Sequence, residues 1–213
     1  MHAGFPHYTT NLIHVLQIGA GTDDVLKAFL SRTGGTLVAG TMALLLKLGF
    51  GFVMRDGLLD QQQSDKAKAF FEENFVIMDP EAADGKRYYQ GKFLIRTRKA
   101  EDDMNVFFSF CPSPEKLFIK MPWGKCLNPL EVVHTKVLTE DEADALEQAQ
   151  GEIDLVIRFR DTESILGLIG GTGLDIVDLL LDNVVQPQGN VGHLFKLGAI
   201  GANIQQALPA LAP

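Results

Sequence analysis

The sequence predicts an α+β fold in which antiparallel strands are combined with amphipathic helices. Two observations lead to this prediction. Between positions 92 and 160, several short segments alternate apolar residues with other residues, which is the period of a strand. The segments before and after these positions repeat apolar residues every three to four positions, as helices do. Strands and helices do not alternate regularly, so a parallel doubly wound sheet is not expected.

The composition is that of a globular protein and argues against nucleic acid as a partner. The chain has 213 residues, 46% hydrophobic and 22% charged, which allows a sizeable core. Its net charge of −8 repels phosphate backbones. The two cysteines lack the spacing of a metal site or a disulfide scaffold, and the first ten residues do not form a signal peptide. We therefore expect a reduced, cytoplasmic protein.

Residues 1–60 are predicted to form a helical extension interrupted by glycines. Its apolar, glycine-rich segment, residues 34–54, approaches the length of a membrane span. Lys47 and five glycines lie inside this segment, and a lysine within a lone span is costly. The preferred interpretation is therefore a helix buried in the protein or against a partner. Transient contact of residues 34–54 with a membrane surface is the second interpretation, and a true span is the third.

A helix and three strands are predicted next. Ser64 is a candidate N-cap for a helix that begins the second part of the chain, and its phenylalanines share one face. Three alternating segments follow, at residues 92–98, 105–110 and 116–123. Short turns would join them most simply as an antiparallel meander.

The polar segments around these strands are predicted to lie on the surface. Arg96, Arg98 and Lys99 are followed by acidic residues and indicate a solvated hairpin end. Residues 124–151 form a polar excursion that contains a surface helix. Thr139 and the glutamate three residues later have the spacing of a capping box for that helix.

The last third of the chain combines strands and short helices. Residues 152–161 alternate most regularly and predict a strand, after which Asp161 and its neighbour can cap the first of two short helices. Pro187 makes the next extended piece an edge or terminal strand. Asn190 is predicted to begin the final apolar helix.

Catalytic and cofactor motifs are incomplete. Gly19 and Gly21 follow an apolar run, but Asp24 stands where a dinucleotide fingerprint needs a small residue. The glycine-rich segment 167–175 lacks the lysine of a P-loop. The five histidines have no metal-ligand spacing, and Cys111 is interpreted as a small buried residue. We therefore expect no catalytic set, no cofactor and no metal.

Near its C-terminal end, the chain resembles the sterol carrier protein family. The matching features are a strand that ends in the capping residue Asp161, two short helices, a short strand, and the segment GNVGHLFKL (residues 189–197), which opens an apolar helix. The resemblance is close over residues 154–201 and extends loosely over residues 64–208. The excursion at 124–151 is longer than the tight connection that the family has between its third and fourth strands, and the first 60 residues have no counterpart in the family's core domain.

The resemblance implies a five-stranded, mainly antiparallel sheet covered on one face by helices, with a hydrophobic tunnel between them. It places this lipid-binding domain at residues 64–208, with an insertion at 124–151 and the helical extension 1–60 before it. A carboxylate headgroup would meet Arg96, Arg98 or Lys196. The lipid-binding side chains would be Phe93, Ile95, Phe108, Phe110, Ile119, Met121, Ile157, Phe159, Leu168, Leu180, Leu194, Leu197, Gly201 and Ile204.

Three functions are compatible with these features of the sequence. The first is non-enzymatic binding and transport of an apolar small molecule, such as a fatty acid, an acyl chain or a sterol-like lipid. The second is a protein-interaction or homodimerisation module with a dry core. The third is an enzyme that uses S-adenosylmethionine or a nucleotide at Gly19 and Gly21. A lipid-filled cavity would favour the first function, and a dry core would favour the second. Binding of S-adenosylmethionine would favour the third.

Overall fold

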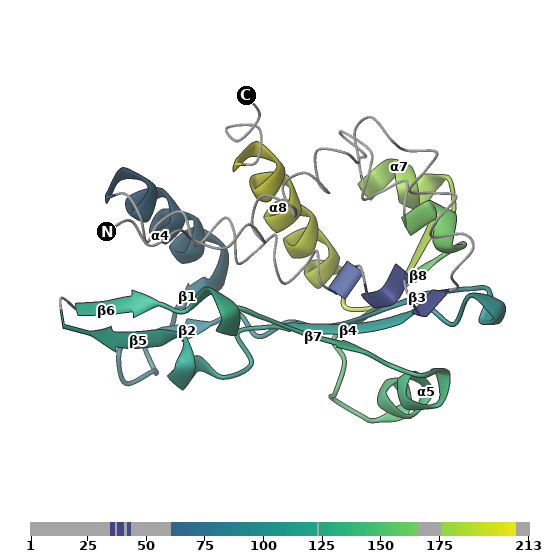
Figure 1. Ribbon diagram of the computed structural model, residues 1–213, viewed down its shortest axis with the longest axis horizontal. Helices are drawn as coiled ribbons and strands as arrows, with labels where there is room; N and C mark the ends of the chain where they lie inside the picture. The colour runs from purple at the N-terminus through teal and green to yellow at the C-terminus, as the bar shows by residue number, and fades with distance from the viewer. Residues whose placement is uncertain are drawn as a thin grey trace, which may run out of the picture.

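The computed structural model describes residues 35–36, 38–40, 42–43, 61–122, 124–165 and 176–207. Over these ranges the chain has an α+β fold built on a five-stranded mixed sheet. Figure 1 shows this sheet edge-on, with helices on both of its sides. On one side lie α4 (Gln61–Phe75), α7 (Ile176–Leu181) and α8 (Val191–Ala207), and on the other lies α5 (Glu140–Gln148).

The strand order of the sheet is β7-β4-β3-β8-β9. All neighbouring strands are antiparallel except β3 and β8, which are parallel. The sheet is therefore mixed, where we expected a mainly antiparallel one. The strands are β3 (Lys92–Thr97), β4 (Asn105–Phe110), β7 (Val133–Val137), β8 (Leu155–Phe159) and β9 (Val185–Gly189).

Three of the predicted strands are confirmed, because β3, β4 and β8 lie where the alternation of apolar residues is clearest. Phe93 lies opposite Phe108 on one side and Leu155 on the other, so apolar residues from three strands share one face. The prediction from Pro187 is also confirmed, since β9 is an edge strand and contains this residue. Proline lacks the N–H that an inner strand would donate.

The predicted meander is wrong in its third strand. β5 (Phe118–Met121) does not join the main sheet but pairs with β6 (Gly124–Leu127) in a separate two-stranded hairpin. Instead β7 pairs with β4. The excursion at 124–151 therefore supplies an edge strand of the main sheet. Another small sheet pairs β1 (Val76–Met78) with β2 (Lys86–Tyr88).

Helices lie on both faces of the sheet, whereas we expected them on one face only. The capping box predicted at Thr139 is present, because its side chain accepts from the Glu142 N–H and the Glu142 carboxylate accepts from the Thr139 N–H. This cap begins α5, which buries Ala143 against Leu94 and Val156 of the sheet. A small second core therefore lies on the face opposite α4 and α8.

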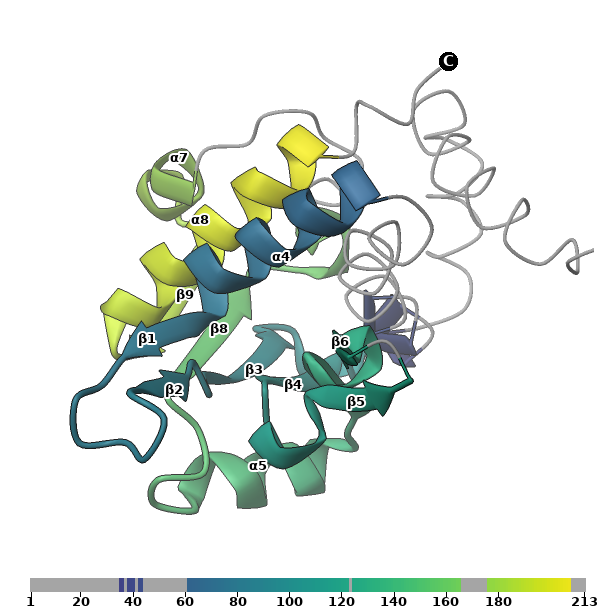
Figure 2. The same cartoon turned by 90° about the vertical axis from the view of Figure 1, so that its left-hand side faces the viewer.

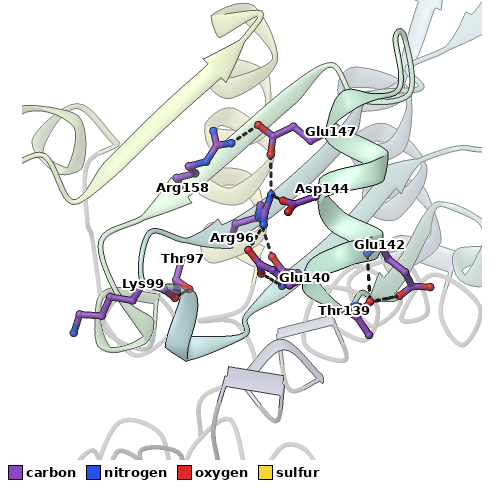
Figure 3. A network of polar contacts seen from close by, with 10 residues as sticks. Arg96, Thr97, Lys99, Thr139, Glu140, Glu142, Asp144, Glu147 and Arg158 are labelled. Carbon is purple, nitrogen blue, oxygen red and sulfur yellow. Dashed lines mark hydrogen bonds and ion pairs between the residues drawn. The ribbon is translucent and has the colours of Figure 1, made fainter.

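Arg96 anchors this second core, whereas we expected it to be solvated. Its side chain lies on the same face of β3 as Leu94 and is only 6% exposed. The guanidinium donates to Asp144 at 2.7 Å and to Glu147 at 2.9 Å, and it also pairs with Glu140 (Figure 3). All three carboxylates come from α5. The arginine therefore joins the helix to the sheet.

Besides the cap at Thr139, two of the other three helix starts that we predicted are confirmed. The Asn190 Oδ1 accepts from the Gly192 N–H at 2.9 Å, directly before α8. The Asp161 Oδ1 accepts from the Ser164 N–H at 2.8 Å at the start of a short helical segment. The cap expected at Ser64 is wrong, because α4 already begins at Gln61 and Ser64 lies within it.

Several expectations lie outside the described residues. These are the turn at Gly19 and Gly21, the segment 167–175 with Leu168, and most of residues 34–54. Of the helices in the described ranges, none is both long and apolar enough to span a bilayer.

Candidate functional site

The candidate site is the apolar face of the main sheet, on the side of α4 and α8. Because side chains alternate along a strand, every second residue of β3, β4 and β8 points to this side. All of these side chains except that of Thr97, at the end of β3, are buried and belong to one cluster. We call the buried ones the apolar face: Phe93, Ile95, Val106, Phe108, Phe110, Leu155, Ile157 and Phe159.

Aromatic rings form the centre of the apolar face. The rings of Phe93 and Phe108 lie opposite each other in the β3–β4 register and stack with centroids 4.7 Å apart. Phe110 meets both rings edge-on, with centroids 5.7 and 5.6 Å away. Such pairs favour one fixed arrangement of the rings beyond the burial of area alone. Because these rings lie at its centre, we also call the apolar face the aromatic wall.

Two long helices cover this wall side by side (Figure 2). On α4, Phe71 and Phe75 are buried in the same cluster, and on α8 Leu194 and Ile200 are fully buried in it. The Asn203 side-chain amide donates to the Asn74 Oδ1 at 3.2 Å, which joins the two helices. The wall is thus covered by helices that are far apart in the sequence.

The described part of residues 34–54 also covers the wall. Val38, Ala39, Met42 and Ala43 are helical and buried in the same cluster. Over these residues, the predicted buried helix is confirmed. The spacing 38, 39, 42 and 43 is itself a helical stripe and is the sequence signal for this placement. The expected boundary between an extension and a domain near residue 60 stays a prediction.

Gly201 leaves space on the stripe of α8 that faces the sheet. Leu194 is fully buried, Leu197 packs partly buried against the same cluster, and Gly201 follows one turn later. A Cβ atom added at Gly201 would have no heavy atom within 4 Å. Gly201 is itself only partly buried, so a side chain at this point of the stripe would enter open space and meet no packed neighbour.

A polar pair borders the aromatic wall. The Tyr89 hydroxyl lies 2.6 Å from Nδ1 of His193, in the first turn of α8, and the two rings stack with centroids 5.6 Å apart. Burial raises the pKa of Tyr89 above its ordinary value of 10.0, with the Asp154 carboxylate a smaller cause. Tyr89 therefore keeps its proton at neutral pH. No sequence pattern singles out Tyr89, whereas the position of His193 follows directly from the start of the final helix.

Lys196 lies one turn further along α8 and is half-buried. Burial lowers the pKa of its ammonium group, and the Glu73 carboxylate acts in the opposite direction. We expected three basic residues to meet a headgroup, and Lys196 is the one that lies on α8. Arg96 is wrong in that role, because it lies on the opposite face and is held by carboxylates. Arg98 donates to the Asn183 carbonyl at 2.5 Å.

The structure brings together nine of the fourteen side chains that we expected to bind lipid. Ile119 lies apart from this cluster, in the β5–β6 hairpin, and is exposed. Gly201 borders the space on α8, and Leu168 with the side chains of Met121 and Ile204 lies outside the described residues. The nine in or against the cluster are Phe93, Ile95, Phe108, Phe110, Ile157, Phe159, Leu180, Leu194 and Leu197.

No metal-binding cluster is present among the residues that the structure describes. Cys111 is fully buried as expected, and burial raises the pKa of its thiol to about 12, which keeps it protonated and unreactive. An open groove of about 430 Å³ runs along β9, between Arg158, Leu180 and Asn183, and is not an enclosed tunnel.

Comparison of the chain with protein-family models, curated proteins and solved structures finds no match.

Proposed function

We propose that the chain binds an apolar small molecule between the aromatic wall and the helices that cover it, and carries it without catalysing a reaction. The observation that carries this proposal is the buried apolar face under α8, together with the open position at Gly201. Gly201 lies on the stripe of α8 that faces the sheet, where a Cβ atom would touch nothing. A fatty acid, an acyl chain or a sterol-like lipid has the chemistry that such a space would accept.

The energetics favour hydrocarbon as the ligand. Each methylene removed from water contributes about 0.8 kcal/mol. The covering helical residues are 38–40, 42–43, 61–75 and 191–207, and none of them is hydrogen-bonded into the sheet as a strand. They can separate slightly from the wall to admit a ligand without breaking strand pairing. Tyr89, His193 and Lys196 supply polar groups at the border, where an oxygen of the ligand would lie.

The resemblance of residues 154–201 to the sterol carrier protein family supports the same proposal. We extend it to the cytoplasm as the place of action, since both cysteines are free thiols. No catalytic role is needed for this function.

The test is native mass spectrometry of the full chain as purified from cells, before and after organic extraction. The expected result is an added mass that extraction removes and that fragments as a lipid. The apo protein should then take up a fluorescent fatty acid or sterol. A clean apo mass together with no uptake of either probe would overturn the proposal.

A pair of variants on one helix locates the ligand. Gly201→Leu places a side chain in the space on α8, and we expect less bound lipid with an unchanged urea midpoint. Ala199→Leu on the exposed side of the same helix is the matched control and should bind lipid as the wild type does. Equal binding by both variants would place the ligand elsewhere.

A dimerisation module is the second candidate, and exposed apolar side chains favour it. Leu181 on α7 is 78% exposed and Phe195 on α8 is 58% exposed. Large apolar side chains in such positions are typical of interaction surfaces when they gather in a patch. Sedimentation velocity tests this function. A concentration-dependent dimer that Phe195→Ser abolishes, in a chain free of lipid, would favour it over the carrier.

A further inference from the structure

The β5–β6 hairpin stands apart from the main sheet. Among the residues that the structure describes, its strands pair only with each other, and Figure 1 shows the hairpin beyond one end of the main sheet. Its base is anchored, because the ring of Phe118 packs against Phe71 and Tyr88 with centroids 6.1 Å away. Leu127, opposite Phe118, packs against the main core. The hairpin is therefore a fixed projection.

The hairpin carries a local positive charge on an acidic protein. Residues 118–127 contain Lys120 and Lys125 and no acidic residue, whereas the whole chain has a net charge of −8. The two lysines lie directly opposite each other in the strand register, and both are exposed. Like charges in this arrangement repel. Neither lysine forms an ion pair with a carboxylate in the described part of the chain.

Apolar side chains are exposed on both faces of the same hairpin, because Phe118 shares the face of the lysine pair and Ile119 lies on the opposite face. Ile119 is 43% exposed and Phe118 is 38% exposed, although Phe118 also packs on the core. Apolar residues next to lysines on a projecting element are typical of a segment that lies in the interface of a bilayer. There the hydrocarbon enters the boundary with the acyl chains, and the ammonium groups meet anionic headgroups.

From these two observations we propose that the β5–β6 hairpin docks the protein on the surface of an anionic lipid bilayer. Lys120 and Lys125 contact the headgroups, and Ile119 enters the interface. The acidic remainder of the chain is repelled by the same surface, so the protein docks in one orientation, hairpin first. Docking does not depend on the proposed carrier function. A chain that binds no lipid cargo can still dock, and a carrier can fail to dock.

Vesicle binding of the full chain tests the charge pair. We compare co-sedimentation with vesicles of phosphatidylcholine mixed with phosphatidylserine and with vesicles of phosphatidylcholine alone. The double variant Lys120→Gln/Lys125→Gln should lose binding to the anionic vesicles by about fivefold per lysine. Lys86→Gln/Lys99→Gln removes the same charge from exposed lysines outside the hairpin and should bind as the wild type does. Added salt should weaken the wild-type binding.

A second pair of variants tests the apolar contact. Ile119→Ser should lower binding, while Leu181→Ser, on an even more exposed residue of α7, should not. The chain has one tryptophan, Trp123, which lies between the two strands in the sequence, so its emission should shift to shorter wavelength with anionic vesicles only.

Each variant retains the main sheet, and far-ultraviolet circular dichroism confirms that it is folded. Equal binding by the hairpin and control variants would overturn the proposal. So would equal binding to neutral vesicles, or an unchanged tryptophan emission with vesicles that bind the protein.

Discussion

The Tyr89 hydroxyl and Nδ1 of His193 lie 2.6 Å apart, although 104 residues separate them in the chain. The backbone of Tyr89 is bonded to the end of α4, because its N–H donates to the Phe75 carbonyl at 2.8 Å. This one residue therefore connects the end of α4, the border of the aromatic wall and the first turn of α8. These two hydrogen bonds of Tyr89 join α4 and α8 beside the place that we propose for the polar group of the ligand.

Removing the Tyr89 hydroxyl should weaken the attachment of α8. We expect Tyr89→Phe to lower the free energy of unfolding by about 1 kcal/mol, because it leaves a half-buried imidazole nitrogen without its partner. Urea unfolding measures this change. A double-mutant cycle with His193→Phe, which keeps a ring in place, should give a coupling energy of about 1 kcal/mol. A coupling energy near zero would contradict the hydrogen bond.

Gly189 should tolerate no side chain. Its φ of +122° is unfavourable for other residues, and an added Cβ would lie 2.4 Å from the Asp154 carbonyl oxygen. That oxygen accepts from the Asn190 N–H at 3.1 Å, so it cannot move away freely. We expect Gly189→Ala to lower the free energy of unfolding by about 3 kcal/mol.

Gly85→Ala is the matched control for this prediction. Gly85 also has a positive φ, +71°, but an added Cβ would meet nothing within 4 Å. The expected loss is about 1 kcal/mol from backbone strain alone. Equal losses for the two variants would show that contact with the Asp154 carbonyl contributes nothing.

Arg96 should contribute strongly to stability because it is buried with partners on α5. Arg96→Met removes the cation that Glu140, Asp144 and Glu147 share and leaves Glu147 paired with Arg158 alone, and we expect a loss of about 2 kcal/mol. Arg96→Lys should not restore it, since an ammonium group lacks the planar fork that reaches several carboxylates. Urea unfolding followed by circular dichroism measures both. Arg160→Met, at an exposed ion pair, should cost less than about 1 kcal/mol.

The sequence was most informative where local pattern decides the structure. Alternation located β3, β4 and β8, Pro187 identified the edge strand, and Thr139 began α5. These features depend on residues close in the chain, so a single sequence can indicate them.

Sequence patterns failed where residues far apart in the chain determine the strand pairing or the partners of a side chain. Residues 118–121 alternate as the other strands do, but alternation does not specify the partner strand, and β7 pairs with β4 instead. Arg96 looked solvated because its carboxylate partners lie 44 to 51 residues further along the chain. In the candidate site, the phenylalanines could be predicted from the strands. Tyr89 could not, since its partner belongs to α8.

Asp161 should make stability depend on pH in the acid range. The hydrogen bond from the Ser164 hydroxyl, with smaller contributions from the Ser164 N–H and Arg160, holds the pKa of this carboxyl below its ordinary value of 3.8. The stabilisation from the charged form is therefore present above that ordinary value and is lost as the pH falls through the lower value of the folded state.

Urea midpoints measured from neutral pH down to about pH 3 check this dependence. Asp161→Asn keeps a capping oxygen but cannot titrate, so its midpoint should fall less steeply with acid than that of the wild type. Asp178→Asn, on the exposed surface of α7, should follow the wild type. An equally steep fall for Asp161→Asn would contradict the assigned role of the carboxylate.

The two cysteines should differ in reactivity. Cys111 is fully buried with a thiol pKa raised to about 12, whereas Cys126 is only half-buried in the projecting hairpin. Because the thiolate is the reactive form, an aromatic disulfide reagent should modify one thiol per native chain and the second only after unfolding. Cys126→Ser should remove the fast reaction, and Cys111→Ser should leave it unchanged. A fast reaction that Cys111→Ser abolishes would mean that the core around Phe110 and Val132 opens in the native protein, which would expose the aromatic wall itself.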